Sequence, residues 1–78
     1  MKLTEAPYDK PLRIASVQGG EGVRRRLLAL GFHQGDRIMI VSSGILQGPI
    51  LVRNLAADVT VALGRGVAFK ILVEPDHV

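Results

Sequence analysis

The chain has 78 residues, of which 47% are hydrophobic, and its formal net charge is +3. It contains no cysteine, which excludes disulfides, thiolate metal sites and cysteine nucleophiles. No apolar run approaches the ~18 residues of a membrane span, and the N-terminal segment lacks the apolar core of a signal peptide. We therefore expect a single small domain over residues 1–78, located in the cytoplasm.

The first part of the chain predicts an extended lead-in, a strand and a glycine loop. Residues 1–11 contain prolines and predict an extended segment that Leu3 anchors to the sheet edge. Residues 12–17 predict the first strand, whose apolar residues face inward with a bulge near its end. The loop at 19–22 lacks the Gly-Lys-Ser/Thr of a phosphate-binding loop, and its Glu21 would repel an anion. This loop is therefore interpreted as a plain lead-in to a helix.

Residues 23–41 form the segment around which the rest of the chain is predicted to fold. Apolar residues recur there at i, i+4 and i+7, which is typical of one helical face: Val23, Leu27 and Leu30. Gly31 then suits a left-handed helix cap, and Phe32 can fold back against the helix end. A turn follows over residues 33–36, in which Gly35 is free to take a positive φ. The pattern predicts a helix to about residue 30 that passes into a strand within a few residues.

The remaining chain predicts strands joined by short turns. The expected strands span residues 36–43, 50–54, 59–63 and 69–74, with a hairpin loop over 42–49. The predicted inward-facing residues of the last two strands are Val59, Val61 and Leu63, then Phe69, Ile71 and Val73. Residues 64–68 suit a single 3₁₀ turn, and residues 76–78 are expected to fray. An open sheet of such strands would leave long edges unpaired, so we expect an all-β fold that closes into a small barrel.

Titratable residues do not form a catalytic or metal-binding pattern. The two histidines are His33 in the turn and His77 in the tail, and only His33 with Asp36 approaches a ligand pair. No serine has a histidine nearby in sequence, and no carboxylates are spaced as an acid–base pair. The sequence therefore predicts no enzyme, no metal centre and no cofactor. Aromatic residues are too few for a base-stacking platform, so no nucleic acid is expected as a partner.

The one dense charge cluster is Arg24, Arg25 and Arg26. Three successive residues fan across about 200° of a helix, so they cannot all face a core. A solvated helix face and a docking surface for an acidic partner both fit this pattern. Other apolar residues expected at the surface are Leu28 beside the arginines, Ile45 and Leu46 at a loop tip, and Leu72 on the outer face of the last strand. If these residues converge, they predict a contact patch; if they scatter, they mean little.

The string RRRLLALGFHQGDRIMIV resembles the signature of the FeoA family, the small ferrous iron transport protein A. The signature positions are occupied by Arg26, Leu27, Leu30, Gly31, Phe32 and Gly35. Later fragments are similar to the family as well: Gly48-Pro49-Ile50, Val61-Ala62-Leu63, and Ala68, Ile71 and Val73. The chain departs from the family at Gly48-Pro49, which lacks the acidic residue often found there, and at Gly64-Arg65-Gly66, where charged residues often follow the strand.

This resemblance implies an SH3-like barrel of five to six strands with one short α-helix inserted after the first strand. It also implies a cytoplasmic accessory protein that binds and modulates the cytosolic GTPase region of the membrane transporter FeoB. Such a protein would meet the membrane only through that partner and would not carry iron itself. The lack of a metal-site pattern in the sequence agrees with this role.

Two other functions fit the same residues. The first is the SH3-like regulatory domain at the C-terminus of iron-dependent transcriptional repressors, which resembles the FeoA family. Because 78 residues leave no room for a helix-turn-helix before Leu12, such a chain would act only in trans. The second is a small nucleic-acid-binding barrel, which would gather basic residues on one sheet face. The arginines outside the helix are instead expected on different strands and turns: Arg13, Arg37, Arg53 and Arg65.

Overall fold

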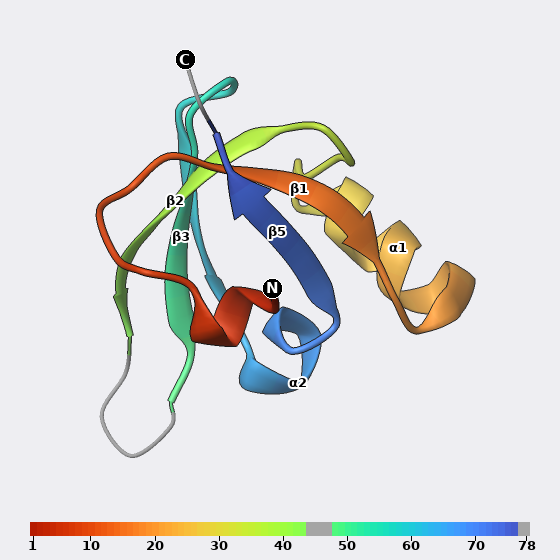
Figure 1. The fold of residues 1–78 in the computed structure, drawn as a ribbon. Coiled ribbons are helices and arrows are strands. Elements are labelled where there is room, and N and C mark those ends of the chain that lie inside the picture. The colour runs from red at the N-terminus through yellow and green to blue at the C-terminus, as the bar shows by residue number, and fades with distance from the viewer. Residues whose placement is uncertain (44–47, 77–78) are drawn as a thin grey trace.

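The computed structural model describes residues 1–43 and 48–76, and its elements are arranged as shown in Figure 1. A 3₁₀ turn, η1 (Leu3–Glu5), precedes the first strand, β1 (Leu12–Val17). Helix α1 (Gly20–Ala29) follows, and then come β2 (Arg37–Ser43), β3 (Ile50–Asn54) and β4 (Val59–Leu63). A short helix, α2 (Arg65–Ala68), leads into the last strand, β5 (Ile71–Pro75).

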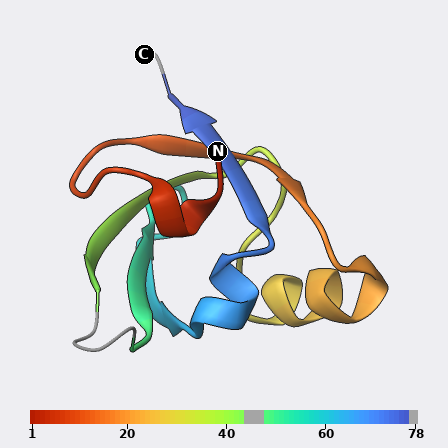
Figure 2. The same cartoon turned by 60° about the horizontal axis from the view of Figure 1, so that its bottom comes forward.

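The described strands form one antiparallel sheet in the order β4-β3-β2-β1-β5. The register shifts between Ile14 and Ser16 opposite β5, and between Ile40 and Ser42 opposite β3. Such bulges bend a strand and increase its twist. The sheet accordingly curls around a central core (Figure 2). The sequence predicts the first of these bulges, and the all-β barrel that it predicts is confirmed.

The first residues of the chain add to the sheet beside β5. Lys2 forms an antiparallel bridge with Leu72. The Met1 ammonium donates to the carbonyl of Val73 (2.9 Å), and the Val73 N–H donates to the carbonyl of Met1 (2.7 Å). Turn η1 then carries Leu3 into the core, where it is fully buried. Leu3 is thus confirmed as an anchor, although the lead-in is not wholly extended because η1 interrupts it.

The core fills the inside of the curled sheet and is closed by residues from the helical segments. Its strand residues are Leu12, Ile14, Ile38, Ile40, Ile50, Val52, Leu63, Ile71 and Val73. Leu27 of α1 and Ala68 of α2 complete it from the ends of the barrel. Removing this apolar surface from water is the main favourable term in folding a domain of this size.

Two residues that the alternating pattern places inside are exposed. The last strand begins at Ile71, so Phe69 instead follows α2 as its C-terminal cap residue and is 53% exposed. Val59 lies on β4, an edge strand, and is 40% exposed. Residues 65–68 also differ from the prediction, because they form a short α-helix and not a 3₁₀ turn.

Helix α1 begins at Gly20, within the segment predicted as a loop. Gly19 precedes it with φ 94°, and a Cβ there would lie 2.8 Å from Cδ of Lys70. The left-handed backbone is what favours glycine at this position, because the lysine side chain is flexible and could move aside. The end of the helix agrees with prediction. Gly31 has φ 93°, and the N–H of Phe32 donates to the carbonyl of Leu27 (2.9 Å).

Candidate docking surface

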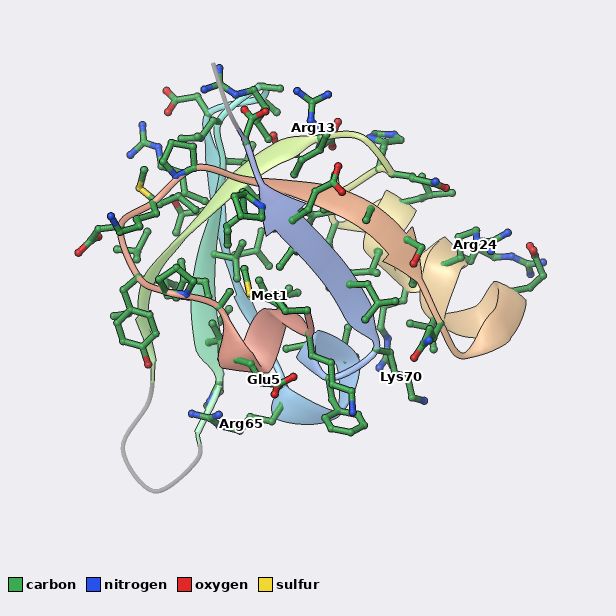
Figure 3. All side chains as sticks on the ribbon, in the orientation of Figure 1. Met1, Glu5, Arg13, Arg24, Arg65 and Lys70 are labelled. Atoms are coloured by element: carbon green, nitrogen blue, oxygen red, sulfur yellow. The ribbon has the colours of Figure 1, made fainter. Side chains whose placement is uncertain are left out.

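Helix α1 separates one buried residue from a basic exposed face. Leu27 is 1% exposed and packs under the barrel, with Val23 and Leu30 partly buried on either side of it. The three arginines that follow Val23 are all exposed. Nη1 of Arg24 donates to Glu21 Oε1 one turn away (3.2 Å), and Figure 3 shows Arg24 directed away from the sheet. Because this pair is exposed on both sides, it contributes little to stability and leaves the face basic.

An apolar hollow opens beside this face. Its volume is about 220 Å³, and its lining residues are Val17, Arg24, Leu27, Leu28, Phe32, His33 and Gln34. Leu28 is 46% exposed, and it lies at the hollow, so its apolar surface is continuous with the apolar lining. A protein cavity of about 150 Å³ can hold a benzene-sized group. The hollow therefore has room for an apolar side chain of a partner, with Arg24 at its edge.

The turn after α1 forms the far wall of the hollow and is fixed to β1. The N–H of Gly35 donates to the carbonyl of Ile14 (2.8 Å), and Nε2 of Gln34 donates to the carbonyl of Ala15 (2.9 Å). Gly35 has φ 91°, as the turn pattern predicts. These contacts hold the wall in place independently of any partner, so the hollow is preformed.

Asn54 and Asp36 fasten the same turn to the end of β3. Asn54 is 1% exposed, and its Nδ2 donates to the Gly31 carbonyl (2.8 Å) and to Asp36 Oδ2 (3.0 Å). The Asp36 carboxylate also accepts the backbone N–H of His33 (2.8 Å). Partial burial acts to raise the pKa of Asp36, but the hydrogen bonds from His33 and Asn54 outweigh it and hold that pKa below its ordinary value. The sequence pattern did not single out Asn54, whose only signal is a polar residue at an inward position of β3.

The structure brings together some of the predicted site residues and separates others. Arg24, Arg25, Arg26 and Leu28 share α1, and the signature residues from Leu27 to Gly35 form the helix end and turn behind them. Leu72 is partly buried on β5 and not exposed, because Lys2 pairs with it. Ile45 and Leu46 lie outside the described residues. Of the four apolar residues of the expected patch, Leu28 is exposed as predicted and Leu72 is not, while the prediction for Ile45 and Leu46 stays a prediction.

The described residues were compared with the requirements of a metal site and of a membrane-spanning helix. Within residues 1–43 and 48–76, no group of three or more His, Cys, Asp or Glu residues is placed to hold a metal ion. Nδ1 of His33 lies 3.3 Å from Asp36 Oδ2, which is a hydrogen-bonding contact, and His77 lies outside the described residues. Among the helices described, none is long and apolar enough to cross a membrane.

A second charged cluster lies where β1 and β2 meet the end of the chain. Arg13 and Arg37 are direct cross-strand partners, and both donate to the carboxylate of Asp76, whose side chain is 3% exposed. The distance from Arg13 Nη2 to Asp76 Oδ1 is 2.7 Å. Arg13 and Arg37 lie on different strands, as predicted, and the register of these strands makes them neighbours. The expectation that Asp76 frays is wrong, because its carboxylate accepts hydrogen bonds from both arginines. Neither the strand register nor these contacts can be inferred from local sequence pattern.

Comparison with known proteins adds sequence and fold relatives to this geometry. The model of the FeoA domain family matches residues 1–75. A protein of Methanocaldococcus jannaschii assigned as Fe(2+) transport protein A is 28% identical over 61 residues, covering 78% of this chain and 70% of that protein. The zinc-complexed FeoA of Stenotrophomonas maltophilia has a TM-score of 0.75 and 29% identity, covering 95% of this chain and 89% of that one.

The Stenotrophomonas protein is described as a prokaryotic SH3 domain protein and proposed as a bacterial ferrous iron transport activating factor. The fold of the present chain is accordingly an SH3-like barrel, as predicted. The manganese regulator SloR has a TM-score of 0.82 at 13% identity, covering 96% of this chain and 34% of that one. At that identity the likeness to SloR shows the fold alone.

Proposed function

Because the chain belongs to the FeoA domain family, an iron transport accessory family with an SH3-like fold, we propose that it docks on the cytosolic region of the ferrous iron transporter FeoB. In this proposal it acts in the cytoplasm as a non-enzymatic interaction module that modulates the transporter. The contact surface is the exposed face of α1 with Arg24, Arg25, Arg26 and Leu28. The role as an accessory protein rests on the family; the partner and the contact surface are our inference.

The observation that carries the proposal is the preformed apolar hollow beside Leu28. An interface needs a central apolar anchor surrounded by polar groups that set orientation. The hollow supplies a place for the anchor, and the arginines of α1 supply the cationic rim. An acidic partner segment carrying one apolar side chain fits both features. Rim charges of this kind act mainly on the rate of association and on its salt dependence.

The first prediction tests this surface with Arg25→Glu combined with Leu28→Asp. Both side chains are exposed, so the melting temperature should change little. A charge forced into an apolar contact costs several kcal/mol, so binding to the FeoB cytosolic region should weaken by at least about tenfold. Uptake of ferrous iron should fall in cells that depend on this protein. The measurements are a thermal melt, a binding titration and an uptake assay.

A matched control uses Lys10→Glu with Val59→Asp. This pair makes the same change in charge, and Val59 is 40% exposed on the edge strand β4, which two strands separate from β1, the strand that α1 contacts. The control should bind and support uptake normally. If the α1 variant folds and still binds as well as the control, the helix face is not the docking surface.

The SH3-like regulatory domain of metal-dependent repressors is the second candidate, favoured by the likeness of fold to SloR. Low identity restricts that likeness to the fold. A salt-sensitive gel shift on operator-like DNA would support this candidate over FeoB docking.

A further inference from the structure

An exposed aromatic ring stands at the end of the molecule formed by η1 and α2, away from the hollow beside Leu28. Phe69 is 53% exposed, more than any other large hydrophobic residue in the described part of the chain. The Lys2 ammonium lies over its ring, 3.5 Å from the centroid. A cation held over a ring face is attracted by the electrons of the ring, so this interaction fixes the position of the Lys2 ammonium relative to the exposed ring.

Two further cations flank the ring. Figure 3 shows Arg65 and Lys70 on either side of α2. A shallow, open hollow of about 570 Å³ lies there, lined by Thr4, Arg65, Gly66, Phe69 and Lys70. Among the described residues, no carboxylate lies within 4.0 Å of the charged nitrogens of Lys2, Arg65 or Lys70. The positive charge of this surface is therefore not neutralised by ion pairs in the fold.

Two of the cations are held by contacts that leave their charge available. Nε of Arg65 donates to the Gly48 carbonyl (3.1 Å). The Lys70 stem packs over Gly19, and its backbone carbonyl accepts the N–H of Gln18 (2.7 Å). The nearby acidic residue is Glu5 of η1, which is exposed and unpaired in the salt bridges of the described chain. The surface thus carries an excess of positive charge with one opposing carboxylate.

We propose that Lys2, Arg65, Phe69 and Lys70 form a site for the anionic headgroups of a phospholipid membrane surface. Aromatic rings favour the boundary between headgroups and acyl chains, and lysine and arginine stems can extend from that boundary to the phosphates. Each cation near an anionic leaflet adds to binding, so three cations and one ring give weak, reversible attachment. The membrane contact is direct, in contrast to the expectation from the family resemblance that the membrane is met only through FeoB.

The shape of this surface favours a membrane over an acidic protein segment. The hollow is broad and shallow, and the surrounding cations come from two parts of the chain, Lys2 and the stretch 65–70, around one exposed ring. A protein segment would be better held by a deeper and less open apolar hollow, as found beside Leu28. The proposal does not rest on the proposed function, because lipid binding can be measured without FeoB.

A tryptophan in place of Phe69 provides the direct test. The chain contains no tryptophan, so Phe69→Trp introduces a single tryptophan whose emission can be excited selectively beside that of Tyr8. Its emission should shift to shorter wavelength with vesicles rich in phosphatidylglycerol and stay unchanged with pure phosphatidylcholine. Tyr8→Trp is the control, since Tyr8 is 50% exposed and lies outside this surface, and its emission should not shift. Cosedimentation of the unsubstituted chain makes the same comparison without any substitution.

Position 66 allows the charge to be varied without removing a contact. A Cβ on Gly66 meets nothing within 4 Å, so Gly66→Ala, Gly66→Lys and Gly66→Glu should all fold. Each added or removed charge should change the vesicle partition coefficient by about fivefold. Relative to Gly66→Ala, the Lys variant should bind more tightly and the Glu variant more weakly. Glu5→Gln should also raise binding about fivefold, whereas Lys10→Gln should leave it unchanged.

Three outcomes would overturn the proposal. The first is equal binding, or no binding, to both kinds of vesicle. The second is that inorganic phosphate releases the protein from the vesicles while chloride at the same ionic strength does not. This result would indicate a site for free anions. The third is that the protein binds polyglutamate and not vesicles, and that Gly66→Lys strengthens and Gly66→Glu weakens the binding of polyglutamate. This result would indicate an acidic protein partner.

Discussion

At the scale of single residues, the buried side chain of Asn54 makes four hydrogen bonds. Its Nδ2 donates to the Gly31 carbonyl and to Asp36, while its Oδ1 accepts the N–H groups of Ala56 (2.9 Å) and Ala57 (3.3 Å). One buried amide thus fixes both the end of α1 and the turn after β3. A buried polar group is tolerated only when its hydrogen bonds are satisfied, and here they are.

The prediction at this scale concerns Asn54→Ala. The substitution leaves the Gly31 carbonyl and two backbone N–H groups without their partner, so we expect the free energy of unfolding to fall by about 2–3 kcal/mol. Urea denaturation measures this change. Gln34→Ala is the matched control, because that exposed amide makes one hydrogen bond to Ala15 and should cost less than about 1 kcal/mol. An equal decrease in the free energy of unfolding of the two variants would show that the buried hydrogen bonds of Asn54 contribute no more than the exposed one of Gln34.

At the scale of elements, α1 depends on the barrel for its stability. A helix of 10 residues is marginal in isolation, and its first turn has no side-chain cap. Its fixed position therefore comes from Leu27, which is 1% exposed, and from the Gly31 and Phe32 contacts at its end. The position of the proposed docking face therefore depends on Leu27 and Phe32, which also line the hollow beside it.

Leu27→Ala tests this dependence. Loss of a buried leucine removes transfer free energy and leaves a cavity, at a cost of about 2–5 kcal/mol. A small domain has only about 5 kcal/mol in total, so the variant should be largely unfolded or melt far below the original protein. Leu28→Ala is the control, since Leu28 is 46% exposed and should change stability by about 0.5 kcal/mol or less. If Leu27→Ala and Leu28→Ala melt together, α1 is not packed as described.

Local pattern predicted those elements whose periodicity and end signals agree. The strand at β1, the bulge within it and the Gly31–Gly35 turn follow from neighbouring residues alone. Pattern also placed the exposed arginines on one helix. It failed at Phe69, because an apolar residue next to a strand is indistinguishable from the first residue of that strand. It could not show that Lys2 and Phe69 meet, since their contact depends on how the chain closes.

At the scale of the whole molecule, the segment directly after β5 is joined to the middle of the sheet. Asp76 follows β5 and reaches the cross-strand pair Arg13 and Arg37, and its N–H donates to the Pro11 carbonyl (3.2 Å). Two arginines directly opposite each other would repel without a carboxylate between them. The contact thus ties β1, β2 and the segment after β5 together at the end of the barrel opposite α2 (Figure 1).

This contact makes stability depend on pH. The hydrogen bond from Arg13, and after it the hydrogen bond from Arg37, hold the pKa of Asp76 below its ordinary value, although burial opposes them. The pKa of Asp36 is also lowered: its partial burial acts to raise that pKa, but the hydrogen bonds from His33 and Asn54 outweigh this effect. A carboxylate with a lowered folded-state pKa stabilises the protein above the unfolded-state pKa, which is about 3.9 for aspartate. That stabilisation is lost as the pH falls from about 5 through the folded-state pKa.

Asp76→Asn should therefore melt below the original protein at pH 7, with the difference shrinking as the pH falls toward about 3. The melting temperature of the variant should still decrease somewhat as the pH falls. Part of that decrease should come from Asp36, because the substitution does not change its lowered pKa. Thermal melts across this pH range measure both curves.

Asp58→Asn is the control, because it removes an equal charge from a pair with Arg53 in which the Asp58 side chain is 78% exposed. Its melting temperature at pH 7 should stay close to that of the original protein, since exposed pairs contribute little. Parallel curves for Asp76→Asn and the original protein would mean that the joined chain end does not stabilise the barrel. The charge on Asp76 would then serve only to offset the two arginines.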